Sequence, residues 1–254
     1  MRANKWPAVL LTVALLLAAP VLAAAADLMA QGLEAQRAGK HEDAVKLLGE
    51  YLAKHPTSAE ARVARANSLN ALKRRDEALK ELDQGLKFNP GKAPLLQAKG
   101  KLLVEDGKYQ EAIALFTKAL SADPKNAEAY QERAEAYTQE GRLEDALQDL
   151  NRAVNLAPKN PWGYFKRGMV KFSLGNFQEA VGDMSRAIEL NPEGPLFYFA
   201  RGQIYYRHLN EPDKGLADFK KGCQLGHPLC CRELEQLEGT LKKNGKAKAQ
   251  TERR

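Results

Sequence analysis

The sequence predicts an all-α fold, in which about six helix-turn-helix repeats stack into an α-α superhelix and a C-terminal capping helix follows. Three sets of residues, each recurring with a 34-residue period, predict this class. A proline closes each period, an alanine lies twelve residues before it, and a small residue lies twelve residues before the alanine. The sets are Pro56, Pro90, Pro124, Pro158 and Pro192; Ala44, Ala78, Ala112, Ala146 and Ala180; and Gly32, Ala66, Gly100, Ala134 and Gly168. A fixed period of this length is typical of a solenoid built from one repeated unit.

Each period contains the pattern of two helices joined by a turn. In the third period, apolar residues at helical spacing lie on both sides of Gly107. Gly107 can adopt the left-handed conformation that ends a helix, and Pro124 disfavours helical geometry at Asp123. The small residues at Gly100 and Ala112 allow the two helices to approach closely. The second period has Lys73 where the other four have glycine, so its turn must form without one.

These positions resemble the tetratricopeptide repeat (TPR) family. The resemblance covers five units near residues 25–58, 59–92, 93–126, 127–160 and 161–194, and an altered sixth unit near 195–228. The sixth unit carries one extra residue between His208 and Lys214, and Gly215 takes the alanine position. Residues 229–241 are expected to form the capping helix that a solenoid needs at its end, which gives a TPR solenoid over 27–241. The resemblance implies a right-handed superhelix, with the first helix of each pair lining the concave face.

A correlation between two further positions indicates how the paired helices contact each other. Where the first helix has arginine one residue before the small position, the second helix of that unit has an acid. The pairs are Arg65 with Glu81, Arg133 with Asp149, Arg167 with Asp183 and Arg201 with Asp218. Where the third unit has Lys99, the partner position holds Leu115. We therefore expect Arg–carboxylate bridges between helices, rather than a row of arginines that binds an acidic ligand.

Residues 1–26 have the pattern of a secretory signal peptide. A basic start precedes an apolar stretch from Ala8 to Ala19, and small residues follow. Cleavage is expected after Ala26, with Ala23 as the second choice. The mature chain would then be periplasmic or secreted, without membrane insertion. The alternative is an uncleaved N-terminal membrane anchor, because Ala8 to Ala26 is just long enough to span a bilayer.

The net charge of +7 lies in the two ends of the chain, and the residues between them are neutral in sum. A neutral body removes the main argument for a nucleic-acid surface, so no nucleic-acid partner is predicted. The basic segment 242–254 lacks a core-forming pattern and is expected to be a disordered, solvated tail. The alternative for the tail is contact with an anionic membrane surface or a nucleic acid.

No motif in the sequence indicates catalysis. There is no P-loop, no H-E-x-x-H and no G-x-S-x-G, and the four histidines are scattered among predicted turns. The prediction is a protein that is not an enzyme, with no catalytic residue, no cofactor and no metal site.

Three cysteines and a histidine lie close together near the end of the predicted solenoid, at Cys223, His227, Cys230 and Cys231. Their spacing fits no established zinc pattern well, and an exported chain meets an oxidising environment. The segment is similar to the linked cysteine pairs of secreted cysteine-rich helical repeats, which are spaced eight residues apart. This similarity implies a disulfide between Cys223 and Cys231. Cys230 is then a leftover thiol, either buried or available for intermolecular pairing.

In TPR proteins a groove is lined by the second, fifth, ninth and twelfth positions of each first helix. Carried over to this chain, the groove is polar in its middle and aromatic toward its C-terminal end. The predicted partner-binding residues are Asn67, Lys101, Gln131, Trp162, Phe165, Met169, Phe172, Phe199, Gln203 and Tyr206. Aromatic and methionine side chains are enriched at interface hot spots. The alternative is that several of them pack against the neighbouring unit or the final helix.

One known TPR activity is not predicted. The carboxylate clamp that holds chaperone C-terminal tails needs a lysine beside Asn67, where this chain has Val63. The sequence therefore favours an exported interaction scaffold or adaptor that binds another protein or peptide through its concave groove. The alternative is a structural or self-associating subunit of a cell-envelope assembly, present as a homo-oligomer.

Overall fold

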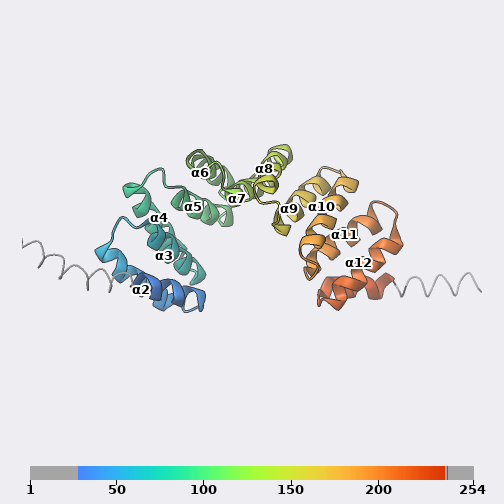
Figure 1. Cartoon of the computed structure of the whole chain (residues 1–254), viewed down its shortest axis with the longest axis horizontal. Helices are drawn as coiled ribbons and strands as arrows, with labels where there is room; N and C mark the ends of the chain where they lie inside the picture. The colour runs from blue at the N-terminus through green and yellow to red at the C-terminus, as the bar shows by residue number, and fades with distance from the viewer. Residues whose placement is uncertain (1–27, 238, 240–254) are drawn as a thin grey trace, which may run out of the picture. The chain divides into compact units, whose positions relative to one another are not determined.

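The computed structural model describes residues 28–237 and Gly239, and within them the chain is helical apart from short turns (Figure 1). The predicted signal peptide and basic tail lie outside the described residues. The first helices of the pairs are 28–37, α3 (Ala59–Ala71), α5 (Ala93–Glu105), α7 (Ala127–Gln139), α9 (Pro161–Ser173) and α11 (Pro195–Arg207). The second helices are α2 (His41–Lys54), α4 (Arg75–Phe88), α6 (Tyr109–Ala122), α8 (Leu143–Leu156), α10 (Phe177–Leu190) and α12 (Pro212–Gln224). A final helix covers 228–237.

The chain divides into two compact units, one ending at Pro124 and the other beginning at Lys125. The first unit holds three helix pairs, from helix 28–37 to α6, and α3 also packs against α5. The second unit holds the pairs α7–α8, α9–α10 and α11–α12, followed by the final helix. In the second unit, and for α5 and α6 in the first, the most extensive packing joins the two helices of a pair, whereas α3 packs on α2 as extensively as on its own partner α4. The described residues thus confirm the predicted all-α class of stacked helix pairs.

The turn inside each pair depends on one residue with positive φ. Gly39, Gly107, Gly141 and Gly175 have φ between 72° and 80°, in the left-handed region where glycine meets no Cβ penalty. Lys73 takes the same conformation, with φ of 63°, so the second turn forms at the cost of a strained lysine. The longer sixth turn uses Asn210, with φ of 54°. Asparagine tolerates this region better than most residues.

Small residues bring the paired helices together. Phe116 in α6 is fully buried, and a Cβ built on Gly100 in α5 would lie 2.6 Å from its ring. A Cβ on Gly202 in α11 would lie 2.8 Å from Phe219 in α12. The repeated small position therefore makes room for one large core side chain, and burial of that side chain stabilises the pair.

The predicted Arg–carboxylate bridges are present in all four pairs. Arg133, Arg167 and Arg201 each donate two hydrogen bonds to Asp149, Asp183 and Asp218, at distances of 2.6–2.9 Å. The acids are at most 5% exposed as whole residues, whereas the arginines are half-buried. Lys99, whose unit lacks the acid, instead reaches Asp83 of the preceding pair at 2.6 Å.

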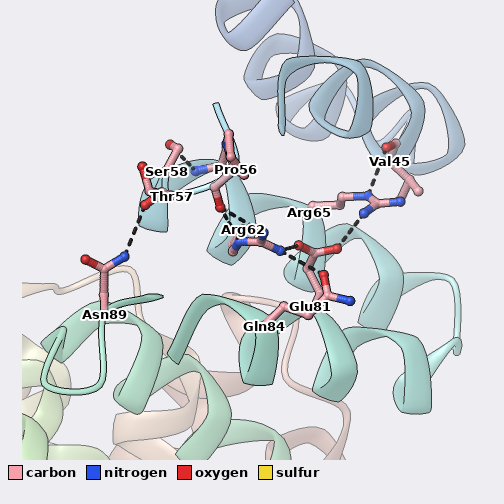
Figure 2. A network of polar contacts seen from close by, with 10 residues as sticks. Val45, Pro56, Thr57, Ser58, Arg62, Arg65, Glu81, Gln84 and Asn89 are labelled. Atoms are coloured by element: carbon pink, nitrogen blue, oxygen red, sulfur yellow. Dashed lines mark hydrogen bonds and ion pairs between the residues drawn. The ribbon is translucent and has the colours of Figure 1, made fainter. Parts of the chain in front are cut away.

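The second pair differs, because the buried Glu81 accepts from two arginines (Figure 2). Arg65 also donates to the carbonyl of Val45 on α2, at 3.2 Å. Arg62 stands where the fourth, fifth and sixth pairs have a tyrosine, and it donates to the carbonyl of Pro56. The two guanidinium groups share one carboxylate and also donate to backbone carbonyls, so each charged side chain in this network has hydrogen-bond partners.

The final helix covers the end of the second unit. Cys230 and Leu237 are buried against Phe219 of α12, and Leu234 packs on the same cluster. The side of the helix that bears Arg232, Glu235 and Gln236 is exposed. A polar outer face is what a terminal solenoid element needs in order to stay soluble.

Candidate functional site

The most exposed apolar side chains among the predicted binding residues lie on α9. Trp162 is 47% exposed and Met169 is 39% exposed, while Phe165 between them is half-buried. Their spacing of three and four residues places the three side chains on one helix face. They form a row that solvent reaches, which we call the α9 row.

The α9 row rests on a buried aromatic ring from the next pair. The ring of Phe197 in α11 lies 5.1 Å from Trp162 and 5.2 Å from Phe165, and Phe197 is fully buried. Trp162 also contacts Phe165 edge-to-face, with 5.6 Å between ring centroids. These contacts hold the rings in place before any partner arrives, which reduces the entropy lost on binding.

A shallow groove of about 270 Å³ lies between α7 and α9. Phe165 and Met169 form one wall and Gln131 and Thr138 of α7 contribute to the other. Leu150 and Val170, both buried, line it as well. The structure therefore brings together three of the predicted binding residues, Gln131, Phe165 and Met169.

The charges that line this groove neutralise each other. Lys166 Nζ on α9 lies 2.8 Å from Glu135 Oε2 on α7, and both residues line the groove. The remaining lining residues are uncharged. The groove consequently offers apolar surface and amide or hydroxyl groups, without an unbalanced charge.

Phe172, which occupies the fourth predicted groove position of α9, belongs to a different aromatic cluster. Its ring lies 5.6 Å from Phe177 of α10 and 5.0 Å from His208, which follows α11. His208 stacks on Phe177 at 4.4 Å. Phe172 therefore packs between neighbouring pairs in this structure.

The final helix covers two of the three predicted residues on α11. The ring of Phe199 stacks on His227 at 5.0 Å, and Gln203 Nε2 donates to Glu233 Oε1 at 2.9 Å. Tyr206 remains 37% exposed. Asn67 on α3 and Lys101 on α5 belong to the other unit, where both are exposed.

The two predicted disulfide partners meet where α12 turns into the final helix. Cys223 and Cys231 have their sulfur atoms 2.01 Å apart, within bonding distance, and their Cα atoms 4.7 Å apart. Cys230 is a buried free thiol, and burial raises its pKa to about 11. Within residues 28–237, no group of three or more His, Cys, Asp or Glu side chains is placed to bind a metal ion.

Sequence reasoning did not single out Phe197, the ring that supports the α9 row. A signal was present, because the same position of the preceding first helices holds Ala61, Leu95, Ala129 and Gly163. A phenylalanine where the repeat has smaller side chains fills extra space between pairs. The Lys166–Glu135 pair joins two adjacent repeats, and repeat comparison alone did not reveal it.

Stacked helix pairs with a 34-residue period and an open groove between first helices place this chain among the α-helical solenoid proteins. Two family models, each described as tetratricopeptide repeat, match it: the first over residues 28–102 and 103–163, and the second over 134–205. The chain belongs to the tetratricopeptide repeat family. A comparison with curated protein sequences gives no match.

Several solved structures share this fold. PilF of Pseudomonas aeruginosa is 17% identical with a TM-score of 0.72, over 84% of this chain and 97% of PilF. YrrB, described as a TPR protein with an unusual peptide-binding site, is 22% identical with a TM-score of 0.59, over 74% of this chain and 97% of YrrB. MamA is 24% identical with a TM-score of 0.59, over 63% of this chain and 93% of MamA. None of the helices in the described part of the chain is both long and apolar enough to cross a membrane.

Proposed function

We propose that this protein is a non-catalytic, exported interaction module that binds an apolar, uncharged peptide segment of another protein. The binding site is the groove between α7 and α9 together with the α9 row. The observation that carries the proposal is the combination of exposed Trp162 and Met169 with a groove whose charges cancel. Family membership supports it, as does the peptide-binding site that the description of YrrB mentions.

The chemistry of the groove selects the class of partner. An apolar side chain inserted beside Phe165 and Met169 removes apolar surface from water, at about 25 cal/mol for each Å². A charged side chain would lose its hydration and find Lys166 and Glu135 already paired with each other. Gln131 can offer an amide to the peptide backbone, which fixes orientation. The partner is therefore a segment with one or two apolar anchors, and the groove acts by presenting a preformed surface.

Export is the second part of the proposal. It rests on the signal-peptide pattern of residues 1–26 and on a cysteine pair placed for a disulfide, since structural disulfides persist in oxidising compartments. The expected location is the periplasm or the outside of the cell. Expression of the full chain in a bacterium, followed by osmotic-shock fractionation and N-terminal sequencing, tests this. A chain that keeps Met1 and stays in the cytoplasm would contradict export.

Selection of displayed random 12-residue peptides on the mature chain tests the binding site. Trp162 is the one tryptophan left after cleavage, so its fluorescence reports binding of each selected peptide. We expect selected peptides to share uncharged apolar anchors and to lose at least tenfold in affinity with Met169→Glu, because the glutamate adds an unpaired charge beside the groove.

Leu156→Glu is the matched control. Leu156 is 41% exposed in the same unit but does not line the groove, so this change should leave affinity unaltered. Charged consensus anchors, or equal losses in the two variants, would contradict the proposal. Light scattering that shows a tight homodimer, broken by Met169→Glu, would instead favour the self-associating alternative.

A further inference from the structure

The final helix, residues 228–237, covers side chains that lie at groove positions of α11. Phe199 stacks on His227, the residue just before this helix, and Glu233 accepts hydrogen bonds from Gln203 and Arg207, both at 2.9 Å. Beneath it lies the fully buried ring of Phe219. Release of this helix would therefore expose more of the Phe199 ring and of the Gln203 amide, both of which are half-buried in the present structure.

The final helix adds only a small apolar face to the core. Its apolar contribution to the core comes from Cys230, Leu234 and Leu237, while Leu229 is 42% exposed. It packs on one side only, because no second helix follows it in the described residues. A helix this short has little stability of its own and depends on what it docks against. One additional covalent bond can therefore determine how often this helix detaches from the unit.

The Cys223–Cys231 pair provides that bond. Cys223 lies one residue before the end of α12 and Cys231 lies in the first turns of the final helix, so a disulfide joins the two helices across their turn. Both residues are half-buried, so neither is sealed inside the core as Cys230 is. The pair lies at the edge of the Phe199–Phe219 cluster, where Cys223 packs.

We propose that the Cys223–Cys231 disulfide is a redox-sensitive latch that keeps the final helix closed over Phe199 and Gln203. A dithiol reductant attacks one sulfur as its thiolate and forms a mixed disulfide, which releases the other cysteine as a thiol. The second thiol of the reductant then displaces the first cysteine and closes a cyclic disulfide. Two electrons and two protons pass to the protein, and the final helix opens more often.

The third cysteine is a built-in reporter of this opening. Cys230 is 0% exposed, and its sulfur packs so closely on Gly222 that a Cβ there would lie 2.4 Å from it. Its raised pKa, about 11, means that little of the reactive thiolate forms while the helix is docked. Alkylation of Cys230 therefore requires that the final helix move away, and its rate measures how often this happens.

The test measures iodoacetamide alkylation of Cys230 by mass spectrometry in the mature chain, in which Trp162 is the one tryptophan. Three samples are compared: the chain purified without reductant, the same chain after dithiothreitol treatment, and the variant Cys223→Ser/Cys231→Ser. We expect the alkylation rate of Cys230 to rise about tenfold or more in the second and third samples, because a short-loop disulfide limits opening by roughly this factor or more. Far-UV circular dichroism and Trp162 fluorescence should stay unchanged, since α9 and its contacts are not part of the latch.

Three results would overturn the latch. One is a non-reducing peptide map that shows three free thiols or a different pairing. Another is equal protection of Cys230 in all three samples. The last is a rise in alkylation accompanied by loss of the Trp162 signal, which would mean that the whole unit unfolds. The latch does not rest on peptide binding at the α9 row, so neither experiment decides the other.

Discussion

Arg167 of α9 and Asp183 of α10 form two parallel hydrogen bonds, with 2.9 Å from Nε to Oδ2 and 2.6 Å from Nη2 to Oδ1. Lys171 Nζ lies 3.0 Å from the same carboxylate. The Asp183 side chain is only 6% exposed, so its charge depends on these partners. The hydrogen bond to Asp183 raises the pKa of Arg167, although burial opposes it, which is the direction expected for a bidentate pair. The pair links α9, which carries the α9 row, to α10.

A double-mutant cycle on this pair should show strong coupling. Arg167→Ala and Asp183→Ala should each lower the free energy of unfolding by about 2–4 kcal/mol, because each leaves a charge without its main partner. The double variant should lose less than the sum, with a coupling of about 1–3 kcal/mol in urea unfolding. Arg186 and Glu189 form an exposed pair on one helix turn, and solvent screening should leave their coupling much smaller than that of Arg167 and Asp183. If the losses of unfolding free energy caused by the two single substitutions simply add in the double variant, the Arg167–Asp183 bridge does not stabilise the fold.

Substitution by alanine should change stability in opposite directions at two glycines in helix interiors. Gly100→Ala should destabilise by about 1–3 kcal/mol, because the new Cβ would lie 2.6 Å from the buried ring of Phe116. Gly182→Ala should be neutral or stabilise by up to about 1 kcal/mol, since nothing lies within 4 Å and alanine favours the helix. Thermal unfolding of the two variants checks this, and similar shifts in both would refute the close approach of α5 and α6.

Replacing Lys73 by glycine should stabilise the first unit. Lys73 holds φ at 63°, and glycine adopts that conformation without the Cβ clash, which amounts to about 1 kcal/mol. The converse change, Gly141→Lys, places a Cβ at φ of 74° and should destabilise by a similar amount. Urea midpoints measure both changes. A destabilised Lys73→Gly chain would mean that the lysine side chain contributes more than the strain it causes.

Burial of Cys230 should make stability depend on pH in the alkaline range. Its thiol has a pKa near 11 when folded, above the value of an exposed cysteine, so the folded chain holds this proton more tightly than the unfolded chain. Its contribution is complete below about pH 9 and is lost as the pH rises through about 11. The ultraviolet absorbance of the thiolate, measured as the difference between the native chain and Cys230→Ala, should have its titration midpoint near pH 11. A midpoint close to that of free cysteine would mean that the thiol is not buried.

The repeat itself could be predicted from the sequence because its causes are local. Three features recur within each period. They are a positive-φ residue in the turn, a small residue where the two helices meet and, in four of the units, an arginine matched to an acid. Repetition makes such signals visible, since five copies of a position report the same constraint. The Arg–carboxylate pairs followed from covariation inside the chain, and the structure contains all four.

The proposed binding surface followed from the sequence only in part. Spacing along α9 places Trp162, Phe165 and Met169 on one face, but spacing cannot say which residues a neighbouring helix will cover. Phe172 and Phe199 occupy groove positions as well, yet Phe177 with His208 and the final helix pack against them. Those contacts join residues that lie 5 to 36 positions apart in the chain.

The sequence by itself determined the class, the period and the position of each helix pair, because hydrogen bonding, turn geometry and charge pairing act over short distances. Tertiary structure alone decided which aromatic side chains remain open to solvent. Phe197 supports Trp162 and Phe165 from the next pair, and the final helix lies over Phe199. Exposure is a property of the packed neighbours of a residue, and those neighbours are known only once the helices have stacked.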